Sequence, residues 1–249
     1  MPSSPLRLAL AQTAPVAADL PANLAAAVDA IRQAAERGAA LIAFPELSLT
    51  GYELAAIAAR PDLWLTVDDL RLEPVRDACA GAGITAVLGA PVRDPDDTPR
   101  LGSLIVTPDR RTVRWCKQHL HGAERELFHA ADADAPLAVA GWQVALGICF
   151  DAAKPSHAAE AAARGADLYL VSAFYSPGDE RRLDLHFGAR AMDHRMFSAM
   201  AGMVGDSSSG PAIGGSGVWA PSGDAVVRAG AAPTLLIAEL DPAQHQQYR

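Results

Sequence analysis

Residues 39–44 form an unbroken apolar run, which a β-strand needs when both of its faces are covered by other parts of the protein. The stretch before it, residues 20–37, carries apolar side chains at helical spacing and ends at Gly38. Asp19 precedes this stretch as a candidate N-cap, and Pro21 fits the first helical turn. A helix followed by a strand buried on both faces points to an α/β fold.

The rest of the chain mixes helix–strand units with hairpins. Residues 109–110 and 141–142 are candidate tight turns, each between two strand-like runs. This mixture predicts mixed rather than purely parallel sheets, and imperfect alternation in several runs fits two stacked sheets with helices outside. We expect further strands over residues 6–12, 84–92, 101–108, 111–117, 137–140, 143–149, 167–173, 198–204, 217–220, 225–228 and 234–240, and further helices over about 70–80, 156–164 and 181–197. No internal repeat or long Gly/Ser linker divides the chain, so we expect residues 1–249 to form one domain.

The composition limits the classes of partner. Of the 249 residues, half are apolar and 20% are charged, with a net charge of −8, as in a soluble globular protein. The negative charge argues against nucleic acid or an anionic membrane as partner. The three cysteines lack disulfide-framework or zinc spacing, and neither a signal-peptide stretch nor a membrane-spanning run is found. We therefore expect a cytoplasmic protein without a nucleic-acid or membrane partner.

Three strand-like runs end in residues of complementary chemistry. Glu46, Lys117 and Cys149 each follow such a run directly. Ligands bind open α/β sheets at the carboxyl ends of the strands, so these side chains stand where a site would form. A carboxylate, an ammonium and a thiol are a possible base, electrophile and nucleophile. The backbone N–H of Phe150 would join Lys117 in binding the oxyanion that forms on attack.

The thiol needs activation, because a cysteine is mostly protonated at neutral pH. A helix is expected to begin at Cys149, and a helix N-terminus lowers the pKa of a thiol. The patterns alone leave a core cysteine, an ordinary turn and a solvated lysine as competing interpretations. Cys79 and Cys116 are expected to be small core residues.

Longer strings around the three residues favour catalysis. They are FPEL at residues 44–47, KQHL at 117–120 and ICFD at 148–151, in this order and widely separated. With lesser features spread over residues 5–240, they resemble the nitrilase superfamily of carbon–nitrogen hydrolases. The resemblance implies a four-layer α-β-β-α sandwich of two mixed sheets flanked by helices, with a Glu–Lys–Cys triad.

By this resemblance, Glu46 is the general base and acid, Lys117 stabilises the tetrahedral intermediate and Cys149 is the nucleophile. The thiolate attacks an amide-like carbonyl, ammonia or an amine leaves, and water releases the acid from a thioester. No metal or organic cofactor is needed.

Many members carry a second glutamate between the lysine and the cysteine, which orients the lysine and the substrate. Glu124 and Glu126 compete for this role. Phe128 and Asp132 put Glu124 in the usual register, so we prefer Glu124, with Glu126 as a solvated loop charge. Residues 153–156 read AKPS where many members have RFPE, a departure that bears on substrate and oligomer contacts rather than on the triad.

The resemblance implies hydrolysis of a C–N bond in a small linear amide or an N-carbamoyl compound. Phe150 and Asp151 after the cysteine resemble the amidase-like branches, whereas true nitrilases commonly have Trp-Glu there. The alternatives are a nitrile hydrolase with the same triad and a catalytically silent binding or scaffold protein. Members commonly pair through helices that flank the active site. We therefore expect a homodimer or larger, with residues 181–197 and the C-terminal segment as contacts.

Candidates for substrate contact rest on position at strand ends. Tyr52 follows the turn that contains Glu46, and Ser172, Phe174 and Tyr175 lie at the end of the strand after the Cys149 helix. His119 and His121 are expected to be solvated, or to support the site from behind its contact residues, rather than to bind a metal. Surface or helix-packing roles are expected for His157, His186 and His194.

Overall fold

The first sheet has six strands in the order β14-β1-β2-β3-β4-β5. In the computed structural model, which describes residues 2–248, the three central strands of this sheet are parallel: β1 (Leu6–Gln12), β2 (Leu41–Ala43) and β3 (Thr85–Arg93). Antiparallel neighbours complete it: β14 (Thr234–Leu240) beside β1, β4 (Pro99–Val106) beside β3, and β5 (Thr112–Cys116) beside β4. The sheet is therefore mixed, as the pattern predicts.

The second sheet repeats this plan in the order β13-β12-β9-β8-β7-β6. Its parallel strands are β7 (Trp142–Ile148), β8 (Leu168–Ala173) and β9 (Phe197–Gly202), and its antiparallel strands are β6 (Leu137–Val139), β12 (Gly217–Trp219) and β13 (Ala225–Arg228). Every residue of β8 is buried, which explains why its sequence is a continuous rather than an alternating apolar run.

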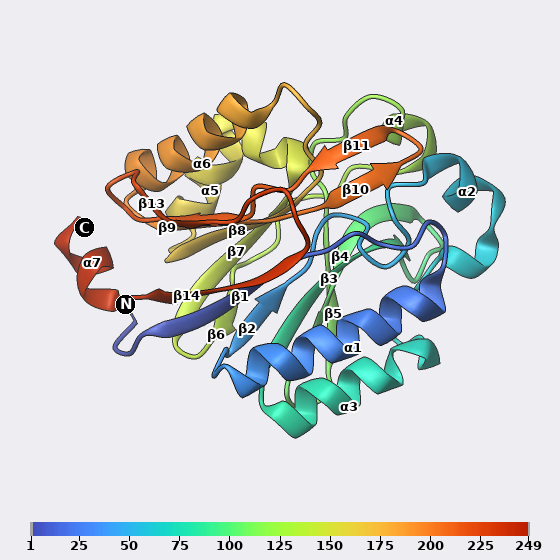
Figure 1. Cartoon of the computed structure of the whole chain (residues 1–249), viewed down its shortest axis with the longest axis horizontal. Coiled ribbons are helices and arrows are strands. Elements are labelled where there is room, and N and C mark those ends of the chain that lie inside the picture. The colour runs from blue at the N-terminus through green and yellow to red at the C-terminus, as the bar shows by residue number, and fades with distance from the viewer. Residues whose placement is uncertain (1, 249) are drawn as a thin grey trace.

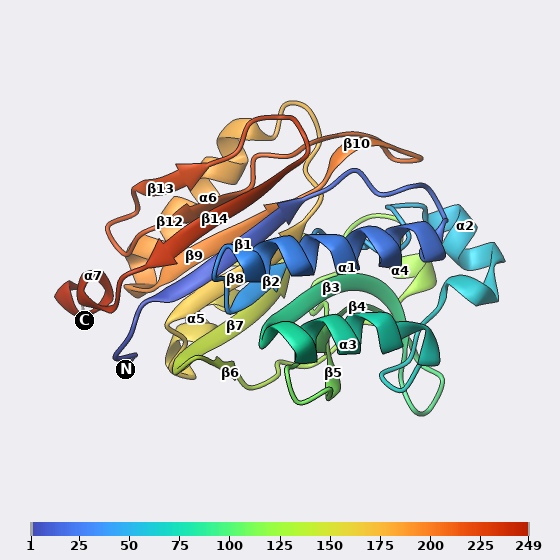
Figure 2. The same cartoon turned by 60° about the horizontal axis from the view of Figure 1, so that its bottom comes forward.

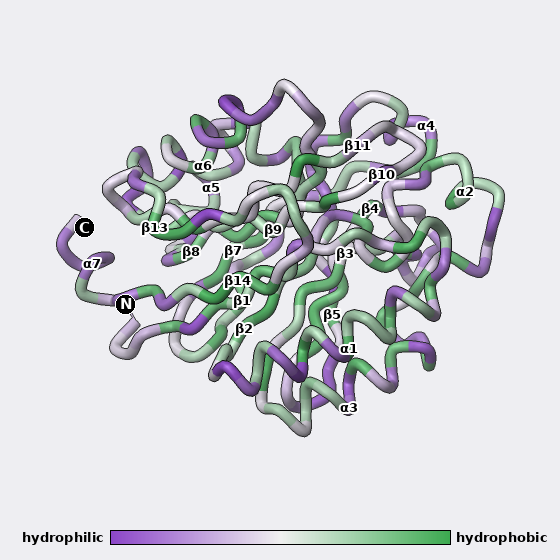
Figure 3. Tube along the Cα trace, in the orientation of Figure 1, coloured by the Kyte–Doolittle hydropathy of each residue, from purple (hydrophilic) through white to green (hydrophobic). Residues whose placement is uncertain are grey.

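Helices cover the outer face of each sheet, as Figures 1 and 2 show. Helices α1 (Leu20–Glu36) and α3 (Glu73–Ala82) lie on the first sheet, and α5 (Pro155–Ala163) and α6 (Glu180–His194) on the second. Hydrophobic residues concentrate in the strands, whereas α1 and α3 alternate hydrophobic and hydrophilic segments (Figure 3). The arrangement confirms the four-layer sandwich. No helix within residues 2–248 is both long and apolar enough to cross a membrane.

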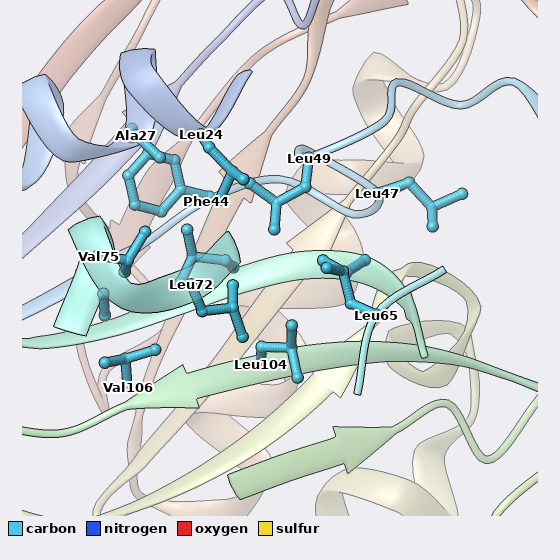
Figure 4. Packing of buried hydrophobic residues seen from close by; sticks show 14 of the residues in the cluster. Leu24, Ala27, Phe44, Leu47, Leu49, Leu65, Leu72, Val75, Leu104 and Val106 are labelled. Carbon is cyan, nitrogen blue, oxygen red and sulfur yellow. The ribbon is translucent and has the colours of Figure 1, made fainter. Parts of the chain in front are cut away.

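The hydrophobic core between the first sheet and helices α1 and α3 also supports the loop that carries Glu46. Leu24 of α1, Val75 of α3 and Val106 of β4 belong to one buried cluster, shown in Figure 4. Phe44 and Leu49, on either side of Glu46, belong to the same cluster. Burial of these apolar side chains fixes both ends of the loop and so restricts where the carboxylate can lie.

Several elements were not predicted. They are α2 (Leu54–Ala59), α4 (Glu124–Leu127), α7 (Pro242–Gln247), and the hairpin of β10 (Val204–Ser207) and β11 (Gly210–Ile213). The hairpin lies in the Gly- and Ser-rich stretch, which has too few apolar residues to show a strand pattern. Its tip is tethered instead, because the backbone N–H of Ser208 donates to Glu53 (3.1 Å) and its hydroxyl donates to the carbonyl of Tyr52 (3.2 Å). Helix α6 ends earlier than predicted because Arg195 adopts a left-handed conformation (φ 54°).

Gly89 of β3 lets the Glu46 loop approach the sheet. A Cβ atom at this position would lie 2.3 Å from the carbonyl oxygen of Pro45 and 2.4 Å from the nitrogen of Leu47. The N–H of Gly89 donates to the Ser48 hydroxyl (3.1 Å), and its carbonyl accepts from the N–H of Leu49 (3.0 Å). The loop is thus held against the one residue that leaves room for it.

Gly89→Ala should therefore displace the Glu46 loop and destabilise the fold by about 1–3 kcal/mol, as overpacking does. Thermal unfolding measures this as a Tm several degrees below that of the parent. The control is Gly81→Ala, on α3, where nothing lies within 4 Å of the added Cβ and alanine favours the helix. An unchanged Tm for Gly89→Ala would contradict the close approach.

Candidate active site

Both sheets contribute strand ends to one end of the sandwich. Glu46 follows β2, Lys117 follows β5 and Cys149 follows β7. Helices α2 and α4 and the β10–β11 hairpin gather at this same end, on the right of Figure 1. The carboxyl ends of strands are where α/β folds bind ligands.

The ammonium group of Lys117 joins two carboxylates. Its Nζ donates to Oε1 of Glu46 at 2.6 Å and to Oε1 of Glu124 at 2.7 Å. All three side chains are buried. Although burial lowers the pKa of Lys117, the negative charges of Glu46 and Glu124, and that of the Cys149 thiol when it is ionised, raise it above its ordinary value. Lys117 therefore stays charged across the physiological range.

Glu124 makes further contacts that fix its carboxylate. Its Oε1 accepts the hydroxyl proton of Tyr52 at 2.6 Å, and its Oε2 accepts from the backbone N–H of His121 at 2.7 Å. Glu126, two residues further on, is exposed to solvent. Of the two competing glutamates, the structure thus places Glu124 beside Lys117.

Cys149 adopts an unusual backbone conformation directly after β7. Its φ of 45° is in the left-handed region, which non-glycine residues rarely occupy. Its thiol donates to the carbonyl oxygen of Phe174 at 3.1 Å, and the residue lines a cavity. Only a five-residue 3₁₀ helix, η3 (Cys149–Ala153), begins at this position.

The expectation of a lowered thiol pKa is wrong. Burial, together with the negative charge of Glu46, raises the pKa of Cys149 well above its ordinary value, and Lys117 opposes this only in part. Desolvation outweighs the opposing effects of the Lys117 charge and of the hydrogen bond to Phe174. The thiol is therefore protonated at neutral pH and needs a neighbouring base.

Glu46 has the properties of such a base. Burial raises its pKa to about 7; Lys117 opposes the rise and Glu124 adds to it. Its second oxygen, Oε2, is buried and has no hydrogen-bond partner among residues 2–248. Glu46 and Cys149 line the same cavity. A carboxyl group that titrates near neutral pH can both take up and return a proton there.

The cavity has a volume of about 340 Å³. Three of the four residues expected to contact substrate line it, namely Tyr52, Phe174 and Tyr175, and the rings of Tyr52 and Phe174 stack at 4.8 Å. Phe150, whose N–H is the expected oxyanion donor, lines it as well. Ser172 does not belong to the described lining, because it lies buried within β8 between β7 and β9.

Other lining residues were missed. Asp179 is the N-cap residue of α6, and Arg182 and His186 lie in the first half of this helix, although the sequence predicts a surface or packing role for His186. Leu54 of α2, His121, Ser176 and Ser209 of the hairpin tip also contribute. No local signal marks these residues, because only the packing of α6 and the hairpin brings them to the strand ends. Among residues 2–248, no group of three or more His, Cys, Asp and Glu side chains has an arrangement that could hold a metal ion.

Comparison with known proteins identifies the family. The carbon–nitrogen hydrolase family model matches residues 7–249. A hydrolase of Mycobacterium tuberculosis strain H37Rv is 32% identical, over 95% of this chain and 89% of that protein. An (R)-stereoselective amidase of a Pseudomonas species is 27% identical, over 95% of this chain and 85% of that protein.

A solved structure shows the same fold. A glutamate-to-glutamine variant of the Nesterenkonia sp. AN1 amidase matches with a TM-score of 0.87 and 27% identity, over 98% of this chain and 93% of that chain. In it, the acetamide moiety of fluoroacetamide is attached covalently to the active-site cysteine. The same enzyme, which is of the nitrilase superfamily, has also been solved in complex with butyramide. With a family match over nearly its whole length and an amidase of that superfamily as a structural neighbour, the chain belongs to the carbon–nitrogen hydrolases.

Proposed function

We propose that this hydrolase cleaves the C–N bond of a small linear amide or an N-carbamoyl compound through a thioester on Cys149. The buried cluster of Glu46, Lys117 and Glu124 beside a cavity-lining thiol carries this proposal. The Nesterenkonia relative supports an amide, because its cysteine forms a covalent adduct and it binds butyramide. In the proposal Tyr52, Phe174 and Tyr175 contact the acyl part of the substrate.

The first half of the reaction forms the acyl-enzyme. The Glu46 carboxylate takes the proton of the Cys149 thiol, and the sulfur attacks the amide carbonyl carbon. The Lys117 ammonium and the Phe150 N–H stabilise the oxyanion. The intermediate then collapses: the C–N bond breaks, and Glu46 returns the proton to the departing nitrogen, which leaves as ammonia or an amine.

The second half releases the product. A water molecule gives a proton to Glu46, and its oxygen attacks the thioester carbonyl. The same two donors stabilise the second oxyanion. When the C–S bond breaks, the sulfur regains a proton from Glu46 and the carboxylic acid departs. Glu124 accepts from Lys117 throughout and holds the ammonium in place.

The direct test is ammonia release from a panel of aliphatic amides, ω-amides, N-carbamoyl amino acids and nitriles. At least one amide or carbamoyl compound should be hydrolysed, and Cys149→Ala should abolish this activity because the nucleophile is gone. Release that persists in Cys149→Ala would contradict a thiol mechanism. Activity on nitriles alone would make the protein a nitrile hydrolase, and silence on the whole panel would favour a binding or scaffold role.

The pH dependence should follow the Glu46 carboxyl group. Only the ionised form can take the thiol proton, and its pKa is raised to about 7. The value of kcat/KM should therefore rise about tenfold per pH unit below pH 7 and level off above it. The apparent pKa belongs to the coupled cluster as a whole. A profile that is flat from pH 5 to pH 7 would rule out Glu46 as the base.

Glu124 and Glu126 form a matched pair of positions. Glu124→Gln removes one of the two charges that hold Lys117, so kcat should fall by about 100-fold or more, in the range of a lost oxyanion donor. Glu126→Gln changes an exposed side chain and should leave kcat within about twofold. Steady-state kinetics on the best substrate of the panel measures both. Equal losses in the two variants would contradict the assignment of Glu124.

We also propose that two copies pair through α6. Leu185 and Met192 are each 55% exposed and lie seven residues apart, on one face of this outer helix. Val226 on β13 is 48% exposed as well. Light scattering should show a dimer or larger, which Leu185→Glu with Met192→Glu should dissociate. A parent protein of about 26 kDa would contradict pairing.

A further inference from the structure

Asp151 has a fully buried side chain that collects several hydrogen bonds. Its Oδ1 accepts from the backbone N–H of His119 at 2.9 Å and lies 2.9 Å from Nδ1 of the His119 ring. Its Oδ2 accepts from the backbone N–H of Ile148 at 3.0 Å. Both carboxylate oxygens are therefore used, and each holds a different segment of the chain.

The two segments belong to different sheets and carry two members of the triad. His119 is two residues beyond Lys117 and follows β5, an edge strand of the first sheet. Ile148 ends β7 in the second sheet and directly precedes Cys149. One carboxylate thus ties the lysine segment of one sheet to the cysteine turn of the other.

The residues behind this carboxylate restrict its position. His157 lies with Nε2 3.8 Å from Oδ2 of Asp151, and its Nδ1 lies 2.9 Å from the Tyr169 hydroxyl. A Cβ atom on Gly147 would lie 2.9 Å from that hydroxyl oxygen and 3.3 Å from Cε1 of His157. The absence of a side chain at Gly147 lets both rings pack under the end of β7.

We propose that Asp151 is a positioning residue, which sets the placement of the Cys149 thiol relative to Lys117 without touching substrate. This rests on the proposed function. Asp151 is fully buried and is not among the described residues that line the cavity, so it acts through its neighbours. Backbone N–H donors point at both carboxylate oxygens. An asparagine at this position would therefore turn its NH₂ group toward one of these donors and lose that hydrogen bond.

The test compares Asp151→Asn with Asp167→Asn. Asp167 is also buried, and its Oδ2 accepts from the N–H of Gln143 at 2.9 Å, near the other end of β7. Both variants should lower the Tm. Only Asp151→Asn should lower kcat, by about 100-fold, with KM within about threefold, because misplacing a reacting group by about 1 Å slows chemistry rather than binding. Alkylation of Cys149 by iodoacetamide should slow by about tenfold in the same variant.

Three results would overturn the proposal. They are a kcat within about threefold of the parent, a rise in KM without a fall in kcat, and an equal fall in kcat for Asp167→Asn. If Asp151→Asn does not fold, His119→Ala decides. It removes only the ring contact, from a side chain that is 34% exposed and outside the described cavity lining. It should lower kcat and the alkylation rate by about fivefold, and unchanged values would overturn the proposal.

The alkylation rate separates this proposal from the proposed function. It needs no substrate, so it reports the placement of Cys149 even if the parent hydrolyses no compound of the panel. A parent without amidase activity in which Asp151→Asn still slows alkylation would reject the function and support the positioning role. If the parent hydrolyses an amide but Asp151→Asn leaves the alkylation rate unchanged, the proposed function stands and the positioning role is rejected.

Discussion

The ammonium of Lys117 lies between the carboxylates of Glu46 and Glu124, and all three groups are buried. Each charge costs several kcal/mol to remove from water, and this cost is offset only when the pairing is close and the remaining lone pairs are used. Two carboxylates around one ammonium leave a surplus negative charge. Burial disfavours a negative charge on Glu46, whose Oε2 has no hydrogen-bond partner among residues 2–248, and the neighbouring charge of Glu124 adds to this effect. The pKa of about 7 follows from this arrangement.

The fold can be understood as the means of assembling that cluster. Each sheet places three parallel strands at its centre, and β2 and β7 deliver Glu46 and Cys149 from opposite sheets. Gly89 lets the Glu46 loop pack against β3, and Asp151 joins the lysine segment to the cysteine turn. Because these ties are made by backbone shape and buried hydrogen bonds, the charged groups meet without rearrangement, which is the condition for electrostatic catalysis.

Much of this architecture could be predicted from the sequence. Buried strands such as β2 and β7 leave apolar runs, so the residues that follow them, including Glu46 and Cys149, can be located at strand ends. The local pattern could not predict the raised pKa of Cys149, because burial depends on what packs over the turn. It also could not show that Ser172 is buried within β8 and absent from the described cavity lining.

Contacts between distant segments account for most of what was missed. Arg182 and His186 reach the cavity only because α6 packs across the second sheet, and the Ser-rich hairpin has no apolar pattern to reveal its pairing. In the sequence, only the spacing to Phe128 and Asp132 distinguishes Glu124 from Glu126. In the structure, both lie on one short helical turn but face different ways. Burial of Glu124 and exposure of Glu126 separate them in space.

In the proposed reaction, Cys149 carries the acyl group of the substrate between the two half-reactions. Rapid acid quenching during turnover of the best amide substrate, followed by peptide mass spectrometry, tests it most directly. The peptide containing Cys149 should gain the mass of one acyl group early in turnover and lose it as substrate is exhausted. Turnover with an acyl group on another residue, or with no acylated peptide at any quench time while the product accumulates, would contradict it.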